Sequence, residues 1–193
     1  MSQPQLNLTS LVIGNRNLII GNRIPKDYFV TKGKGESDIT IHAGSYHLAL
    51  KNAGIERCNI MTYSSILPSI AQEVEKTTNL VHGSVMETIM AVANAEKGKN
   101  ATAGIIYGWL YHKEKGDRYG GLVCEYNGSK STEEAKAQLH GSLQELYENG
   151  FSDEYTLTEI RCITEHVVPT KEYGTALVAL CFVNYVFPVL EAL

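Results

Sequence analysis

The sequence lacks the features that mark several large classes of protein. Its four cysteines lie far apart and form no C-x-x-C pair, which argues against a disulfide framework and for reduced thiols in a cytoplasmic protein. Lys and Arg number 17 against 21 Asp and Glu, so no basic surface for nucleic acid is expected. No apolar run approaches the roughly 18 residues of a membrane span, and the start of the chain has no signal-peptide pattern. We therefore expect a soluble protein without nucleic-acid or membrane partners.

What is present indicates one domain with two main helices. At 193 residues the chain is long enough to bury a substantial core. Residues 42–53 carry apolar side chains at helical spacing. Residues 131–150 have a second apolar stripe, begin with the capping-box pattern of Ser131 and Glu134, and end at Gly150. Both helices have one apolar face, which must be covered by another element.

Most of the other apolar runs indicate strands. A polar turn at residues 113–118 joins two of them into a hairpin, and residues 175–186 are apolar enough for a central strand. Residues 80–96 fit a helix and a strand equally well. Residues 32–38 read as a polar Gly-rich loop without the spacing of a phosphate-binding loop. The predicted strands cover residues 18–20 (or an ordered arm there), 28–31, 55–64, 102–111, 119–126, 156–168 and 173–187.

These elements predict an α+β fold with mainly antiparallel sheets covered by helices. Two sheets packed face to face, each with a helix outside, would bury the apolar faces of all the elements. Oligomerisation would bury any apolar sheet surface left over.

The candidate site begins with the segment Asn59–Ser69, which reads NIMTYSSILPS. A β-prone apolar run leads into Ser64-Ser65, and Pro68 closes the pattern. Paired serines at a strand end usually cap or turn the chain, and the pattern alone favours that interpretation. A chemical role requires a hydroxyl placed among apolar neighbours, which this setting allows.

Glu125 and His47 are two further candidates. Strand alternation puts Glu125 on one face with Gly121 and Val123, and both faces of this strand are apolar. The pattern fits a charge that surfaces at the strand end as well as it fits a desolvated acid with a raised pKa. His47 is expected to share the inward face of its helix with Leu50, which is more typical of a core histidine than of a ligand.

With these residues the chain resembles the pyruvoyl-dependent arginine decarboxylases over about residues 28–187. The specific combination is N-x-x-x-x-S-S-x-x-P followed by G-G-L-x-x-E-Y. The matching pieces are Gly35-Glu36-Ser37-Asp38, YHLALKNAGI at 46–55, the segment 59–68, GGLVCEYNG at 120–128, the capped helix ending at Gly150-Phe151, Thr164-Glu165-His166, and the strand from Gly174 to Tyr185.

The resemblance implies that the chain cleaves itself between Ser64 and Ser65 into a β chain, 1–64, and an α chain, 65–193. The Ser65 hydroxyl attacks the preceding carbonyl, elimination frees the carboxyl end of Ser64, and hydrolysis leaves a covalent pyruvoyl group at residue 65. That ketone reacts with the substrate amine and is the electron sink when CO₂ departs. By the same resemblance, Glu125 reprotonates the product carbanion and Asn59 donates a hydrogen bond at the site. No metal is implied.

His47 departs from the family pattern. The family has an aspartate at this position that binds the guanidinium of the substrate, whereas a neutral imidazole accepts one hydrogen bond and a charged one repels a cation. We assign His47 and Leu50 to substrate binding. Either Asp38 or Glu36 supplies the missing acid, or the substrate is not arginine.

The prediction is therefore a pyruvoyl-dependent amino-acid decarboxylase, with arginine to agmatine as the leading reaction. The resemblance implies a four-layer αββα sandwich that assembles as a homotrimer or a pair of trimers, with sites between subunits. Two alternatives stay open. One is the same chemistry on another amino acid, and the other is an unprocessed relative that binds amines or pairs with an active subunit.

Overall fold

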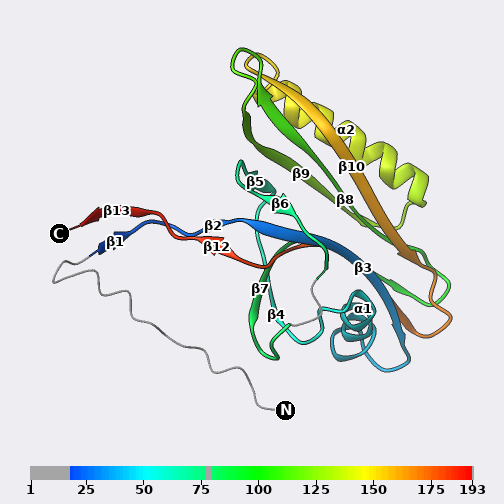
Figure 1. Ribbon diagram of the computed structural model, residues 1–193. Helices are drawn as coiled ribbons and strands as arrows, with labels where there is room; N and C mark the ends of the chain where they lie inside the picture. The colour runs from blue at the N-terminus through cyan, green and yellow to red at the C-terminus, as the bar shows by residue number, and fades with distance from the viewer. Residues whose placement is uncertain (1–17, 77–79, 193) are drawn as a thin grey trace. The chain divides into compact units, whose positions relative to one another are not determined.

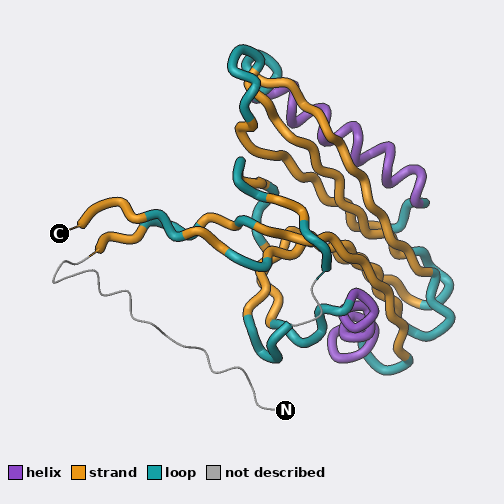
Figure 2. Tube along the Cα trace, in the orientation of Figure 1, coloured by secondary structure: helices purple, strands orange, loops and turns teal. Residues whose placement is uncertain are grey.

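The computed structural model describes residues 18–76 and 80–192 (Figures 1 and 2). The described residues divide into two units, one made of residues 18–24 and 186–192 and one made of residues from 25 to 185. In the first unit, β1 (Leu18–Ile20) pairs antiparallel with β13 (Val189–Ala192), which confirms the predicted strand. The chain passes between the units at β2 (Ile24–Pro25) and β12 (Tyr185–Val186). Every candidate site residue belongs to the second unit.

The larger sheet of the second unit has five strands in the order β4, β7, β11, β3, β6. The central strand, β11, is antiparallel to both of its neighbours, while β4 and β6 pair in parallel at the two edges. The central place of this apolar strand confirms the sequence prediction. The strands are β3 (Asp27–Ser37), β4 (Asn59–Thr62), β6 (Gln72–Glu73), β7 (Val85–Glu96) and β11 (Tyr173–Phe182).

The smaller sheet is antiparallel throughout, in the order β10, β8, β9, β5. β8 and β9 form the predicted hairpin, and Gly116 supplies the positive φ of 73° that its turn requires. β5 is a short edge strand beside β9. The strands are β5 (Ile66–Pro68), β8 (Ala101–His112), β9 (Arg118–Gly128) and β10 (Tyr155–Val167).

A helical segment packs on each sheet (Figure 1). The first begins as a π-helix, η1 (Ile41–Tyr46), and continues as α1 (His47–Ala53). It ends at Gly54, whose φ of 70° suits a left-handed C-cap. Buried side chains of α1 join a cluster with the larger sheet, formed by Phe29, Ala49, Leu50, Ala53, Ile55, Met86, Leu177, Ala179 and Cys181.

The second helix, α2 (Thr132–Gly150), covers the smaller sheet. Its capping box is confirmed, because Ser131 Oγ accepts from the Glu134 amide and the Glu134 carboxylate accepts from the Ser131 amide. The buried stripe of Ala135, Leu139 and Leu143 packs on Ile106, Leu110, Leu122 and Tyr126.

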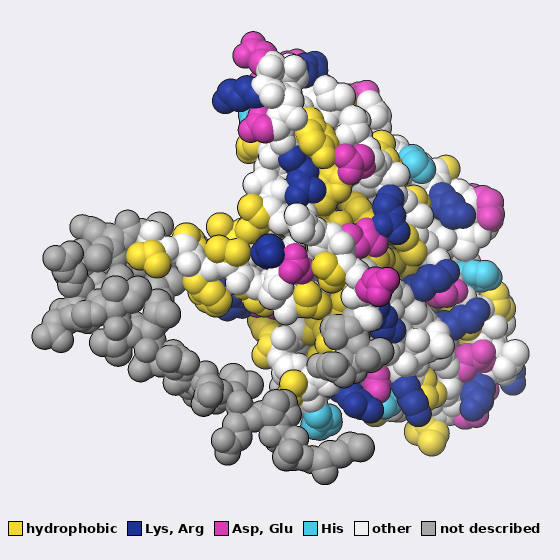
Figure 3. Space-filling model, in the orientation of Figure 1, with side chains coloured by type: hydrophobic (Ala, Val, Ile, Leu, Met, Phe, Trp, Pro, Cys, Tyr) yellow, Lys and Arg dark blue, Asp and Glu magenta, His cyan; other side chains and the backbone are white. Residues whose placement is uncertain are grey.

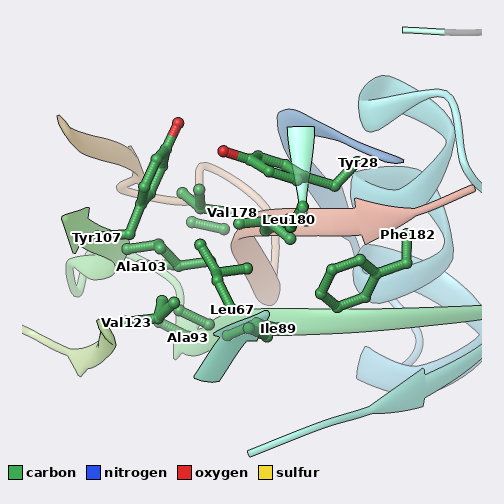
Figure 4. Packing of buried hydrophobic residues seen from close by; sticks show 14 of the residues in the cluster. Tyr28, Leu67, Ile89, Ala93, Ala103, Tyr107, Val123, Val178, Leu180 and Phe182 are labelled. Atoms are coloured by element: carbon green, nitrogen blue, oxygen red, sulfur yellow. The ribbon is translucent and has the colours of Figure 1, made fainter. Parts of the chain in front are cut away.

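The main core joins the two sheets (Figure 4). The larger sheet contributes Ile89, Val178 and Leu180 among others, and the smaller sheet contributes Ala103, Tyr107 and Val123. Each fully buried side chain of this size contributes about 2 kcal/mol of transfer free energy, so this cluster holds the sheets together. An α+β fold with mainly antiparallel sheets is thus confirmed. Among the described residues, no helix is both long enough and apolar enough to cross a bilayer.

The loop predicted at residues 32–38 is wrong, because β3 continues to Ser37. The glycines of this segment let the helical segment η1–α1 pack closely against the backbone of β3. A Cβ at Gly33 would lie 2.2 Å from the Ala49 carbonyl oxygen, and one at Gly35 would lie 2.4 Å from that of Ser45. Glycine in this strand therefore marks a helix resting on the backbone and not a turn.

Two other segments differ from or refine the prediction. The strand predicted at 55–64 is limited to β4, residues 59–62, and the ambiguous segment 80–96 becomes β7 from Val85. β7 is covered on both faces, since Ile89 and Ala91 join the core between the sheets while Met86 joins the α1 cluster. A strand buried on both sides shows little alternation, which explains the ambiguous pattern.

Candidate active site

The Ser64-Ser65 pair lies where the chain crosses from one sheet to the other. β4 ends at Thr62 in the larger sheet, and β5 begins at Ile66 in the smaller one. On one side of the pair the Tyr63 amide donates to the Thr88 carbonyl at 2.7 Å. On the other side the Val123 amide donates to the Ser65 carbonyl at 3.1 Å. Each flank of the Ser64–Ser65 peptide is therefore anchored in its own sheet.

The Ser65 hydroxyl donates to the Glu125 carboxylate. Its Oγ lies 2.8 Å from one carboxylate oxygen and 2.9 Å from the other. Glu125 sits on β9 opposite Ile105, on the side that also carries the buried Val123. The pairing of β5 with β9 brings these two side chains together, although they are 60 residues apart in the chain.

Half-burial makes Glu125 an unusual acid. Desolvation raises the pKa of its carboxyl above the ordinary value of 4.5, and the hydrogen bond from Ser65 opposes this only in part. A carboxyl of this kind can accept or return a proton closer to neutral pH than an exposed one. The desolvated-acid interpretation is the one that the structure supports.

Two adjacent glycines make this approach possible. A Cβ at Gly120 would lie 2.9 Å from the Leu67 carbonyl oxygen, and one at Gly121 would lie 3.1 Å from the Leu67 side chain. A larger residue at position 120 or 121 would therefore press on the Leu67 backbone or side chain in β5, the strand that follows Ser65. The Gly-Gly pair belongs to the motif G-G-L-x-x-E-Y, and glycine inside a predicted strand is itself a signal of a close backbone approach.

Asn59 has a different partner from the one predicted. Its side-chain amide donates to the Gly83 carbonyl at 2.9 Å, and its backbone amide donates to the Ser84 carbonyl at 2.8 Å. The side chain is exposed at the start of β4, whereas Ser65 follows the end of that strand. Its role at the serine pair therefore stays a prediction.

His47 is exposed, so the prediction that it packs inward with Leu50 is wrong. The inward face of this segment is formed by Ser45, Ala49, Leu50 and Ala53, and His47 lies at its margin where the π-helix becomes α1. His47 instead lines a surface pocket of about 460 Å³ with Leu50 and with His42, Ala43 and Tyr46. The rings of His42 and Tyr46 are stacked there at 5.8 Å.

The two acids proposed to replace the family aspartate already have partners. Glu36 accepts hydrogen bonds from Thr170 and from the Lys171 amide, which lower the pKa of its carboxyl. Asp38 lies 3.6 Å from the Lys171 ammonium. Neither acid lines the pocket beside His47.

Comparison with known proteins shows the family to which the chain belongs. The model of the pyruvoyl-dependent arginine decarboxylase family matches residues 27–187. The curated proteins named pyruvoyl-dependent arginine decarboxylase AaxB from Chlamydia abortus and Chlamydia muridarum are each 31% identical over 186 residues, covering 86% of this chain and 94% of theirs. A pyruvoyl-dependent arginine decarboxylase of Methanococcoides burtonii is 37% identical over 86 residues, covering 43% of this chain and 47% of that protein.

The serine hydroxyl is thus hydrogen-bonded to a half-buried carboxyl at the point where the chain crosses between the two sheets. The chain belongs to the pyruvoyl-dependent arginine decarboxylase family. Membership implies a covalently bound pyruvoyl cofactor. Ser65 fits the residue from which that group is made, because it follows Ser64 and its hydroxyl is hydrogen-bonded to Glu125.

The raised pKa of Glu125 predicts a pH-dependent loss of stability. The folded chain keeps this proton at pH values where the unfolded chain has released it, so the contribution to stability is complete below pH 4.5 and is lost as the pH rises through the folded pKa. Glu125→Gln, which mimics the neutral acid, should therefore become more stable relative to its parent as the pH rises.

The parent and the Glu125→Gln variant should both carry Ser65→Ala. This change prevents cleavage and removes the hydrogen bond that opposes the raised pKa of Glu125. Urea unfolding between about pH 4 and pH 8 measures the difference. Glu134→Gln is the control of opposite sign, because its hydrogen bonds lower the pKa of Glu134. A Glu125→Gln difference that does not change with pH would show that this carboxyl is not perturbed.

Proposed function

We propose that this chain is a pyruvoyl-dependent amino-acid decarboxylase that converts arginine to agmatine and CO₂. The observation that carries the proposal is the Ser65 hydroxyl, which follows Ser64 and is hydrogen-bonded to Glu125. Family membership over residues 27–187 supports the reaction class, and the names of the relatives support arginine as the substrate.

The first reaction is cleavage of the chain between Ser64 and Ser65. Glu125 draws the proton from the Ser65 hydroxyl as its oxygen attacks the Ser64 carbonyl carbon. The C–N bond breaks, the nitrogen gains a proton, and an ester replaces the amide. Elimination then releases Ser64 as a carboxylate and leaves dehydroalanine at position 65, and hydrolysis with loss of ammonia leaves a pyruvoyl group on residues 65–193.

In the second reaction the same carboxyl handles the substrate proton. The pyruvoyl group supplies the electron sink for loss of CO₂. Glu125 is half-buried on β9, the strand next to the edge strand β5, and holds a proton within reach of position 65. It returns that proton to the carbon from which CO₂ has left. Asn59 is assigned a hydrogen bond to the carbonyl at the cleavage site.

The substrate side chain is assigned to the pocket that contains His47 and Leu50. Its aromatic and aliphatic lining suits the alkyl stem and the flat guanidinium of arginine, but none of the five lining residues is a carboxylate. A different amino acid is therefore the main rival substrate. The two imidazoles in the lining, His42 and His47, can hydrogen-bond a less cationic side chain.

We propose that complete sites form between copies of this chain in a trimer or a pair of trimers, with the four layers αββα in each subunit. The described hydrogen bonds do not connect His47 or Asn59 with Ser65 inside one chain. Apolar side chains near the serine pair are also exposed, with Met61 at 52% and Ile66 at 69%, and Val85, opposite Asn59 at the other end of β4, is 58% exposed. On the face in Figure 3, hydrophobic side chains likewise lie open among charges of both signs.

We also assign the protein to the cytoplasm. The four cysteines are free thiols, with Cys181 buried and the other three partly buried, which suits a reducing compartment. The rival from another class is an unprocessed relative that binds amines or pairs with an active subunit. It would keep the Ser64–Ser65 bond.

Ser65→Ala should abolish cleavage and decarboxylation, because alanine has neither the nucleophile nor the departing oxygen. Ser64→Ala is the matched control, since Ser64 contributes only its carbonyl, and it should still cleave. Denaturing gels would show fragments of 64 and 129 residues for the natural chain and for Ser64→Ala. Cleavage of the Ser65→Ala chain at this bond would contradict the proposal.

His47→Asp should raise kcat/KM for arginine by about tenfold, because a carboxylate gains a charge-assisted hydrogen bond to guanidinium worth about 1.4 kcal/mol. His140→Asp on the exposed side of α2 is the control for added negative charge. CO₂ release should be measured with arginine, lysine, ornithine, histidine and aspartate. Arginine is the wrong substrate if only another amino acid of this panel is decarboxylated.

A further inference from the structure

The segment that follows Ser65 crosses between the sheets and closes the core. Residues 66–68 form β5 on the smaller sheet, and residues 72–73 form β6 on the edge of the larger one. Leu67 of β5 and Ala71, which lies between β5 and β6, are fully buried in the core that joins the sheets. Figure 4 shows Leu67 within that cluster. After cleavage this segment would be the free end of the larger fragment, with the cofactor at its tip.

Arg118 fastens this segment to the smaller sheet. Its Nε donates to the Ser69 carbonyl and a terminal nitrogen donates to the Ala71 carbonyl, each at 2.8 Å. The guanidinium also lies 4.1 Å from the centre of the Trp109 ring, which is only 5% exposed. A planar cation held between a ring and two carbonyls fixes the backbone more firmly than a single hydrogen bond would.

A second fastening follows at Glu73. Its carboxylate pairs with Arg161 of β10 and accepts from the Tyr107 hydroxyl of β8 at 2.9 Å. Tyr107 and Tyr28 have their hydroxyl ends at the same edge of the core (Figure 4). Glu73, Tyr107, Arg118 and Arg161 line one pocket of about 530 Å³. Both fastenings act on residues 69–73 and neither touches Ser65 or Glu125.

We infer that Arg118 is a positioning residue that holds position 65 against Glu125 once the chain has been cleaved. The inference rests on the proposed function. Before cleavage, residue 65 is tethered on both sides, through Tyr63 to the larger sheet and through β5 to the smaller one. After cleavage the first tether is gone. The new end is then fixed by the bond from the Val123 amide to the carbonyl of residue 65, by β5, by the buried Leu67 and Ala71, and by the two contacts at Arg118 and Glu73.

This order of events sets the expected effect. Loss of Arg118 leaves self-cleavage close to the natural rate, because the double tether still presents the Ser65 hydroxyl to Glu125. It impairs turnover, because a small displacement of the reacting group from its acid is costly. We expect kcat to fall by at least about tenfold with little change in KM, since the substrate pocket at His47 is untouched.

The test compares Arg118→Gln and Arg118→Lys with a control, Arg57→Gln. The Arg57 side chain is 64% exposed and pairs with its neighbour Glu56. Cleavage is followed on denaturing gels, and kcat and KM are measured on the fully cleaved proteins with the amino acid that the natural enzyme decarboxylates. Arg118→Lys should stay impaired, because an ammonium cannot serve two carbonyls while stacked on Trp109. If Arg118→Gln does not fold, Arg118→Lys and Tyr107→Phe, which removes the bond to Glu73, take its place.

The inference is overturned if cleaved Arg118 variants keep the natural kcat, or if cleavage slows as much as turnover. A fall in melting temperature with unchanged kcat would show a structural role alone and would also overturn it. Failure of the natural chain to cleave or to decarboxylate any amino acid of the panel would refute the proposed function itself, and the inference with it.

Discussion

The hydrogen bond between Ser65 and Glu125 depends on a single crossing of the chain between two sheets. The serine pair follows β4 of the larger sheet and precedes β5 of the smaller one. The hydroxyl then lies 2.8 Å from a carboxyl that burial keeps easier to protonate than an exposed acid. A bond at such a crossing can be broken without freeing either flank, because each flank is paired within its own sheet.

β9 is the element on which the site is built. Its first residue, Arg118, holds the segment after the serine pair, and its adjacent glycines Gly120 and Gly121 let β5 approach the backbone closely. Val123 then binds the Ser65 carbonyl, and Glu125 binds the hydroxyl. Strand β9 thus fixes the path of residues 65–71, and it also carries Glu125, the acid that faces the Ser65 side chain. The alternation of the strand turns Leu122 toward α2 and Val123 toward the core between the sheets.

Local patterns predicted the parts of this fold that local physics decides. The capping box at Ser131, the hairpin turn at Gly116 and the apolar central strand β11 are all confirmed. The meeting of Ser65 with Glu125 depends on pairing between distant strands, and only the family resemblance connected the two residues. His47 was misplaced because a π-helical turn shifts the buried face of its segment. Arg118 was missed because a guanidinium that binds backbone carbonyls leaves no paired side chain to recognise.

The central claim is that Ser65 becomes a carbonyl group at the end of a new chain. The mass of the intact purified protein, measured under denaturing conditions before and after borohydride reduction, tests this most directly. We expect a fragment 65–193 that is lighter by one ammonia than simple hydrolysis would give, and that gains two hydrogens on reduction. An uncleaved chain of 193 residues, or a fragment that begins with a free serine, would contradict it.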